Sequence, residues 1–404
     1  MTSFFTWLDY SERERRQMLD VISRFRERDT RDELGIGSVR DAFADLLFPG
    51  TSTIQTRARY FLFIPWMYRS LENKSISSEK IGQRARTEEI TLILALLNSN
   101  DTAGVIGRDA KEKLQRLPSN IYWQGLGTWG IRLNYGSQAQ YHRCLDSYYT
   151  LGRGQQRNDD GEPVGGHQRL NWQPDLPPMP ANFPRQASFA LTHHEAEYLR
   201  ERILLRIPDS LLAFLAAQGQ LTQGVDFPWT HPQYGDFPDH IHTQLTHARN
   251  FSETIYGAVL LYNLMLAEAL HAEDLIKDYR ADLADWEEDM RKRAAVLRPW
   301  AADLTPFWQI AETARVRITF WTKRFITDWL TLATQLPPGA HLADQAAARD
   351  LIANRERQLK HALARLDNPR ALELWTGAAG VFRLDYRWGV TQTLVNDILR
   401  GLEE

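Results

Sequence analysis

The chain of 404 residues contains one cysteine, Cys144, so it can form no internal disulfide and no cysteine-rich zinc site. A single thiol suits the reducing cytosol. Long apolar runs are also missing, because the longest, residues 257–267, is interrupted by Asn263 and is too short to cross a bilayer. No basic stretch leads into an apolar run at the N-terminus, as a signal peptide would require. We therefore expect a cytoplasmic protein that does not contact membranes.

Several sequence motifs that mark common enzyme classes are missing as well. The chain has no G-x-x-x-x-G-K-[ST], no G-x-S-x-G and no G-x-G-x-x-G after a predicted strand. These absences argue against nucleotide hydrolysis and against serine-nucleophile chemistry. The formal net charge of −3 is small for this length, although residues 1–150 hold 21 Lys+Arg against 18 Asp+Glu. We expect no cofactor, and a protein without catalysis of its own is the favoured interpretation.

The residues that are present predict a mainly α-helical protein of two bodies. A hydrophobic content of 43% can build a large core, and apolar residues recur at spacings of three and four in most segments. The capping pair Thr192 and Glu195 predicts a helix over 195–207, and another is expected over 247–270. A seam of Leu275, Tyr279, Leu283, Trp286, Met290 and Leu297 then predicts a long helical hairpin in the second half. We expect an N-terminal helical domain over 1–151, a Gly/Pro-rich linker or long loop over 152–190, and a C-terminal bundle over 191–404.

Within the first domain, residues 38–69 resemble a helix-turn-helix. Ser38 can cap a short helix over 39–47, Pro49 and Gly50 break it, and a second helix is expected from about Thr53. This arrangement would place Gln55, Arg57 and Arg59 near the start of the second helix, where they could contact phosphates and base edges. A packed helical hairpin with a solvated polar corner remains the alternative.

Two other segments are candidates for contacts with nucleic acid. Tyr122, Trp123 and Trp129 could stack on unpaired bases beside Arg116 and Arg132, or could instead plug a loop against the core. In the run RLDYRW, Arg383 and Arg387 form a compact arginine pair that could bind phosphate. An internal pair between Asp385 and Arg387 is equally plausible for that run.

One cluster of histidines suggests a metal site. His240, His242 and His247, with Glu253 and His231 nearby, supply the imidazole and carboxylate groups that suit zinc or iron. Their spacing matches no motif with a known mechanism. A polar loop with histidines at a helix start is the alternative. A first helix over 12–28, capped by Ser11 and with Met18, Leu19, Ile22 and Phe25 inward, completes the predicted elements.

The blocks FTWLDYSERERRQM, GTSTIQTRARYFLFIPW and LPSNIYWQGLGTWGI resemble a family of uncharacterised bacterial proteins with a domain of unknown function. HARNFSETIYGAVLLYNLMLAE and RLDYRW extend the resemblance into the second half. It implies a place beside helicases and phospholipase-like nucleases in antiphage-defence or mobile loci. We therefore expect a non-catalytic nucleic-acid-binding or scaffolding subunit of a DNA-handling complex, with DNA and other protein subunits, such as a helicase or nuclease, as partners. The alternatives are a metal-dependent hydrolase that uses the histidine cluster and a pure protein-interaction bundle.

Overall fold

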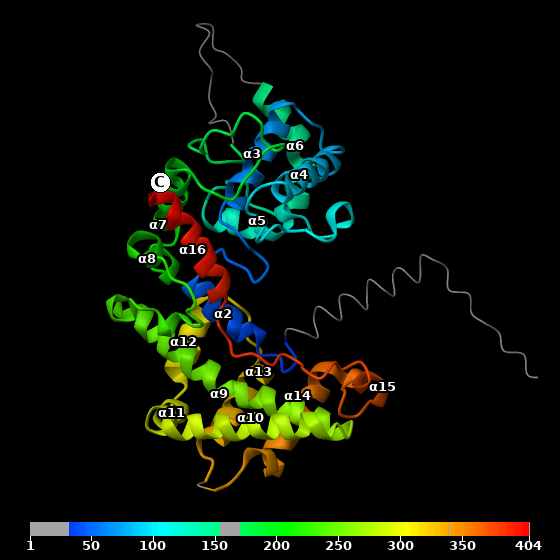
Figure 1. Cartoon of the computed structure of the whole chain (residues 1–404), viewed down its shortest axis with the longest axis vertical. Coiled ribbons are helices and arrows are strands. Elements are labelled where there is room, and N and C mark those ends of the chain that lie inside the picture. Colours follow the sequence, from blue (N-terminus) through cyan, green and yellow to red (C-terminus); the bar gives the residue numbers. More distant parts are fainter. Residues whose placement is uncertain (1–31, 154–169, 338, 404) are drawn as a thin grey trace, which may run out of the picture. The chain divides into compact units, whose positions relative to one another are not determined.

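The computed structural model describes residues 32–153, 170–337 and 339–403. These residues form fifteen α-helices and no strand, with one isolated antiparallel bridge between Arg132 and Trp172, which confirms the predicted mainly α-helical class. In the numbering of Figure 1 the helices are α2 (Gly37–Leu47), α3 (Tyr60–Asn73), α4 (Ile81–Leu97), α5 (Pro118–Thr128), α6 (Gln138–Arg153), α7 (His193–Arg206), α8 (Leu211–Gln218), α9 (Asp239–Ala269), α10 (Glu273–Lys292), α11 (Ala294–Ala302), α12 (Thr305–Thr313), α13 (Phe320–Thr334), α14 (Ala346–Lys360), α15 (Pro369–Leu372) and α16 (Trp388–Glu403). Short 3-10 helices are η1 (Lys111–Lys113), η2 (Pro228–Thr230), η3 (Tyr234–Asp236), η4 (Leu342–Asp344) and η5 (His361–Leu363). The helix predicted over 12–28 lies outside the described residues.

The chain divides into two compact units, each made of two stretches of sequence. Unit 1 is Met1–Phe43 with Thr246–Leu384, and unit 2 is Ala44–Leu245 with Asp385–Glu404. This division differs from the predicted domains 1–151 and 191–404. Unit 2 draws on both predicted domains because α16, at the end of the chain, packs against α7 and α8. Gly401 of α16 permits that close approach, since a Cβ there would lie 2.8 Å from the Cβ of Ala196.

The core of unit 2 is built around α3, whose residues 60–68 are all buried. Phe61 of this helix stacks on Trp129 with ring centroids 3.8 Å apart. The Gly/Pro-rich stretch that was predicted as a linker or long loop packs here where it is described: Pro177 accepts a hydrogen bond of 2.7 Å from the indole of Trp66, and Phe183 stacks on Phe63. Residues 170–190 therefore form an ordered loop of unit 2 and do not connect two bodies.

The core of unit 1 contains the predicted helical hairpin. Helix α9 is apolar and buried over most of its second half, and a short turn leads from it into α10. The seam residues Tyr279, Leu283, Trp286 and Met290 are buried, as expected. Gly257 of α9 faces the ring of Trp286, where a Cβ would come within 2.4 Å of the indole. This glycine sets how closely the two helices approach. The capping box of Thr192 and Glu195 in unit 2 is also confirmed.

The predicted helix-turn-helix is not formed. Helix α2 ends at Leu47, and α3 begins only at Tyr60, so residues 48–59 form a connection that is much longer than the three or four residues of a helix-turn-helix. Gln55, Arg57 and Arg59 lie in this connection and do not lie on a recognition helix. None of the helices that the structure describes combines the length and apolarity needed to span a membrane.

Candidate functional site

The connection between α2 and α3 turns two of its three predicted contact residues inward. Gln55 is 2% exposed, and its amide donates to the carbonyl of Gly50 at 3.1 Å. Arg59 is 8% exposed, pairs with Glu195 at 2.8 Å and donates to the carbonyl of Ser188 at 3.0 Å. A buried guanidinium that has a carboxylate partner ties this connection to α7. Neither side chain is presented to a nucleic acid in this arrangement.

Arg57 lines a cavity of about 560 Å³ in unit 2. Its Nε donates to both carboxylate oxygens of Asp397, at 3.1 and 2.9 Å, and its NH1 donates to Asp101. The guanidinium lies over the ring of Phe189, 4.6 Å from its centroid. Arg400 is the second arginine of the cavity wall. Two arginines thus face two aspartates, and this balance gives the cavity no electrostatic preference for an anion.

The arginine pair of RLDYRW is divided between the two units. Arg387, in unit 2, pairs with Asp45 at 2.6 Å and donates to the carbonyl of Thr51 at 2.9 Å. It therefore holds the start of the connection between α2 and α3. The backbone of Arg387 also contacts Asp385, since the Arg387 amide donates to that carboxylate at 3.1 Å.

Arg383 and Glu253 are two predicted site residues that the structure brings together, in unit 1. Arg383 lies 3.1 Å from the Glu253 carboxylate, which also accepts from Arg249 at 2.9 Å and contacts Arg293. Burial lowers the pKa of Arg293 to about 10, and repulsion by Arg249 and Arg383 adds to the effect. These side chains line a cavity of about 420 Å³, whose wall also includes Asp282, Asp285, Asp289 and Lys292. Acidic and basic groups are equal in number there, and the arginines are gathered around Glu253.

The candidate metal ligands engage separate partners. His240 hydrogen-bonds the carbonyl of Asp209 at 3.0 Å, and the ring of His242 meets that of Tyr234 edge-on at 4.6 Å. His247 accepts from the indole of Trp300 at 2.9 Å, while Glu253 is occupied by arginines. Over residues 32–153, 170–337 and 339–403, no three side chains of histidine, cysteine, aspartate or glutamate come together as a metal site. The structure thus does not assemble the predicted cluster.

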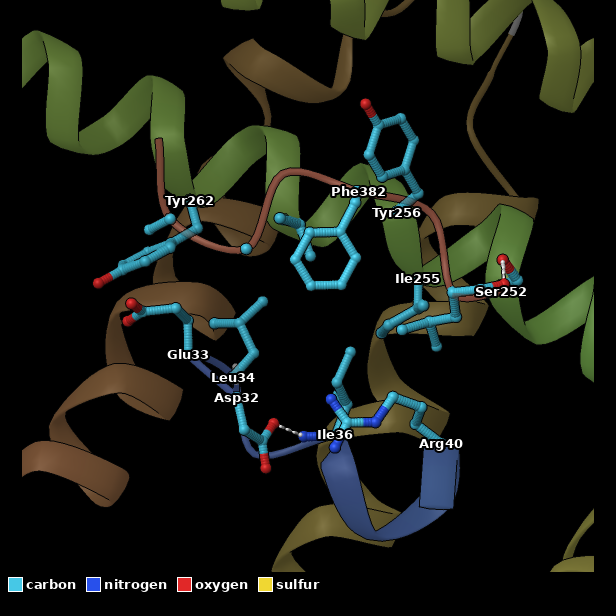
Figure 2. A pocket seen from close by; sticks show the side chains of 14 residues that line it. Asp32, Glu33, Leu34, Ile36, Arg40, Ser252, Ile255, Tyr256, Tyr262 and Phe382 are labelled. Carbon is cyan, nitrogen blue, oxygen red and sulfur yellow. Dashed lines mark hydrogen bonds between the residues drawn. The ribbon is translucent and has the colours of Figure 1, made fainter. Parts of the chain in front are cut away.

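Figure 2 shows a small cavity of unit 1 near Phe382, about 30 Å³ in volume. Such a volume holds about two water molecules and no larger ligand. The hydroxyl of Tyr262, which lines it, donates to Glu356 at 2.5 Å, and Glu33 pairs with Arg365 at 2.8 Å and with Lys360. Burial, with repulsion by Glu33 and Glu356, raises the pKa of Tyr262 well above its ordinary value. These charges compensate one another and tie residues 32–34 to the end of α14.

The aromatic residues proposed as base-stacking platforms are part of the core. Tyr122 and Trp129 are fully buried, and Trp123 is 6% exposed. The hydroxyl of Tyr122 holds the backbone of the connection between α2 and α3, accepting from the amides of Thr56 and Arg57 at 2.8 and 3.1 Å. The alternative interpretation of these residues, in which they plug a loop against the core, is the one that the structure supports.

An exposed aromatic residue lies a few positions further along the chain. Tyr135 is 98% exposed in the turn between α5 and α6. Arg132 stabilises this turn, because its guanidinium donates to the carbonyls of Asn134 and Gly136 and lies 4.8 Å from the ring centroid of Trp123. Sequence reasoning missed Tyr135, although an aromatic side chain inside the polar turn NYGSQ was a usable signal of exposure.

The turn is also tied to the loop that follows α6. Leu133 donates to the carbonyl of Asn171 at 2.9 Å, and Gln173 donates to that of Ile131 at the same distance. Together with the bridge between Arg132 and Trp172, these bonds hold the backbone of residues 131–133, which leads directly to Tyr135. The aromatic side chain is therefore exposed on a rigid support, so little conformational entropy would be lost when it binds a partner.

Cationic side chains occupy the segment before α5. Asn120, in the first turn of α5, hydrogen-bonds Gln138, the first residue of α6, so the first turns of the two helices meet. The segment before α5, RDAKEKLQR over 108–116, has four basic and two acidic residues. Lys111, Lys113 and Arg116 are exposed. We call Tyr135, Lys111, Lys113 and Arg116 the Tyr135 corner.

A buried carboxylate supports the first turns of α5 and α6. Glu89 of α4, 1% exposed, accepts from the amide of Ser119 at 2.8 Å and from its hydroxyl at 2.7 Å. Gln138 donates to the same hydroxyl at 2.8 Å and to the hydroxyl of Tyr68 at 2.6 Å. Burial raises the pKa of Glu89 to about 7, although hydrogen bonds from Ser119 and the charge of Arg86 oppose the shift. Glu89 holds the starts of α5 and α6 in place.

Comparison with known proteins gives one family. Residues 2–400 match the model of a family described as a family of unknown function (DUF6361). No curated protein and no solved structure matches the chain. The family match extends over stretches of both units, and it agrees with the resemblance seen in the sequence blocks.

Proposed function

The chain belongs to the DUF6361 family, and we propose that this member is a non-catalytic, cytoplasmic subunit of a bacterial DNA-handling or antiphage-defence complex. In this proposal the subunit binds single-stranded nucleic acid at the Tyr135 corner of unit 2. Other subunits, such as a helicase or nuclease, would act on the strand that it holds.

The observation that carries the proposal is the exposure of Tyr135 on a rigid support before α6, together with three exposed cations before α5, whose first turn meets that of α6. Sites for single strands combine aromatic rings, on which bases stack, with basic groups that follow the phosphates. Tyr135 is 98% exposed, while Arg132 and the neighbouring backbone bonds hold its turn. A fixed backbone lowers the conformational entropy that would be lost when a base stacks on the ring. Bases are suitable partners because the segment that leads into α5 carries the exposed cations Lys113 and Arg116, which could pair with phosphates.

The five residues predicted from the sequence have a different part in this proposal. Arg57, Arg59 and Arg387 are engaged with Asp397, Glu195 and Asp45. These three arginines and Gln55 make contacts within unit 2, which also contains the Tyr135 corner. Arg383 belongs to the charge network of unit 1. A nucleic acid would reach the four arginines only by breaking their ion pairs. We therefore assign the phosphate contacts to the exposed cations Lys111, Lys113 and Arg116.

The test is binding of a labelled oligothymidylate across a salt series, read by fluorescence anisotropy. Loss of one stacked base costs about 1–3 kcal/mol, so Tyr135→Ala should weaken binding by about 5-fold to 150-fold. Tyr135→Phe keeps the ring and should bind like the parent protein. Arg116→Ala should reduce the slope of log K against log salt by about 0.7, the value for one phosphate contact on a single strand.

Arg324→Ala provides the matched control, because Arg324 is an exposed arginine of unit 1 that lies outside the corner. It should leave affinity and salt slope unchanged. Equal binding by Tyr135→Ala and the parent protein would refute the corner as the site. Metal content is read from the same sample. Stoichiometric zinc or iron together with no binding of nucleic acid would favour the hydrolase that uses His240, His242, His247 and Glu253. The absence of both bound metal and nucleic-acid binding would favour the interaction bundle.

A further inference from the structure

Unit 1 exposes a group of large apolar side chains where α13 begins and α14 ends. Phe320 and Trp321, in the first turn of α13, are 67% and 53% exposed, and their rings meet edge to face at 5.4 Å. Leu359, in the last turn of α14, is 38% exposed, and Leu363 in η5 is 54% exposed. Single exposed apolar residues are common on proteins, but clusters of this kind mark binding surfaces.

Both parts of this cluster border the same short segment of chain. Thr322, next to Trp321, donates to the carbonyl of Gly35 at 3.4 Å. The side chain of Leu359 packs against Gly35 so closely that a Cβ at position 35 would lie 2.9 Å from it. Arg355 joins the two helices at this point, because its guanidinium donates to the carbonyl of Gly35 and to the hydroxyl of Thr322. We call Phe320, Trp321, Leu359 and Leu363 the α13/α14 surface.

The described chain starts beside this surface. Asp32 is the first described residue, three positions before Gly35, and its carboxylate accepts from the amide of Ile36 at 2.5 Å, as Figure 2 shows. Arg355 also holds the carbonyl of Leu34 at 2.9 Å. The segment 32–36 is therefore anchored, and whatever precedes Asp32 starts next to the α13/α14 surface.

The sequence before Asp32 contains a segment with the right chemistry to cover it. Met18, Leu19, Ile22 and Phe25 recur at the spacing of one helical face within the predicted helix 12–28. An amphipathic helix gains most of its stability from packing its apolar face, so this face should have an apolar surface to cover. Only residues 29–31 separate it from Asp32, and the four peptide links from Arg28 to Asp32 reach at most about 14 Å.

We propose that the α13/α14 surface is the docking site of residues 12–28 of the same chain, which would lay the face of Met18, Leu19, Ile22 and Phe25 on it. The inference is independent of nucleic-acid binding, because it concerns unit 1 alone. The short connection makes the local concentration of the segment high, so it outcompetes a second copy of the chain at ordinary protein concentrations.

Disulfide trapping in the full-length chain tests this directly. Cys144 is the only cysteine and is exposed, so Cys144→Ser gives a background without thiols. Phe25→Cys is paired in turn with Trp321→Cys and with Leu363→Cys, and mild oxidation is followed on non-reducing gels. At least one pair should form a bond within the monomer. Glu27→Cys is the matched control, since position 27 lies about 200° around the helix from position 25 and should react at least tenfold more slowly.

Each alternative outcome overturns the proposal. Disulfide-linked dimers would show that a second copy occupies the surface, and equal reaction of positions 25 and 27 would show that no face is selected. A second measurement needs no new bond: hydrogen exchange of residues 12–28 should be slow in the parent protein and at least tenfold faster in Trp321→Ser with Leu363→Ser. Both side chains are more than half exposed, so the fold should tolerate these changes. Fast exchange already in the parent protein would also refute docking.

Discussion

Replacing Glu89 by glutamine should make the protein more stable at neutral pH and should remove part of its dependence on pH. Glu89 is buried and accepts two hydrogen bonds from Ser119, and no basic side chain is paired with it among the described ion pairs. Arg86, the cation that acts on its charge, donates instead to the carbonyls of Leu114 and Glu112. A glutamine can still accept from the Ser119 amide, and its NH₂ can donate to the hydroxyl oxygen, so the shape of the site is kept.

The magnitude follows from the shift of the Glu89 pKa, from 4.5 to about 7 in the folded protein. Because the folded pKa is raised, the native state binds the proton more tightly than the unfolded chain does. The stability that this provides is fully present below pH 4.5 and is lost as the pH rises to about 7. At about 1.4 kcal/mol for each pKa unit, the loss is about 3 kcal/mol. Glu89→Gln does not titrate, so it should avoid this loss.

Urea unfolding at several pH values between 4.5 and 8, followed by circular dichroism, gives the comparison. Glu89→Gln and the parent protein should have similar free energies of unfolding near pH 4.5, and the variant should be more stable by about 3 kcal/mol near pH 8. Glu88→Gln is the matched control, because it removes a carboxylate from the neighbouring position of α4, where the side chain is only partly buried. A constant difference between Glu89→Gln and the parent protein across this range would refute the reasoning.

Further predictions concern the buried arginine of the connection and one helix contact. Arg59→Ala should lower the free energy of unfolding by about 3–5 kcal/mol, because Glu195 would stay buried without its partner, and urea titration measures this. Exposed Arg84→Ala should change the free energy of unfolding by less than about 0.5 kcal/mol. Gly257→Ala should destabilise unit 1 by about 1–3 kcal/mol, because its Cβ would overlap Trp286, as thermal unfolding would reveal. Gly82→Ala, in a helix with room for a methyl group, should instead stabilise by up to about 1 kcal/mol. Equal effects of the two glycine substitutions would contradict the packing argument.

Features that depend on local sequence could be predicted, and they are the ones that the structure confirms. The apolar seam from Tyr279 to Met290 needs only the period of a helix, and the capping box of Thr192 and Glu195 spans four residues. The break between α2 and α3 was also visible at Pro49 and Gly50. Its length was not, because the aromatic contacts that start α3 at Tyr60 come from Tyr122 and Phe189, far along the chain.

The division into units and the partners of the arginines depend on contacts between distant residues. Arg57 meets Asp397 across 340 positions, and Arg387 meets Asp45 across 342. Nothing in the local pattern of either segment identifies its partner. The Gly/Pro-rich composition of residues 152–190 left a linker and a long loop open, and the burial of Trp172, Phe183 and Phe189 in unit 2 favours the loop for residues 170–190. Aromatic residues in such a stretch were the available sign that it packs.

The arginines of the connection illustrate why a cation near the start of a helix is weak evidence for nucleic-acid contact. Residues 60–68 are buried on every side, so the chain just before them must also enter the core, and it takes Arg59 with it. A guanidinium in that position needs a carboxylate, which Glu195 supplies. The segment 108–116 has no such apolar continuation, and its Lys111, Lys113 and Arg116 stay exposed. The apolar character of the flanking sequence therefore separates cations that build the fold from cations that are exposed, and this is why we propose the Tyr135 corner as the contact.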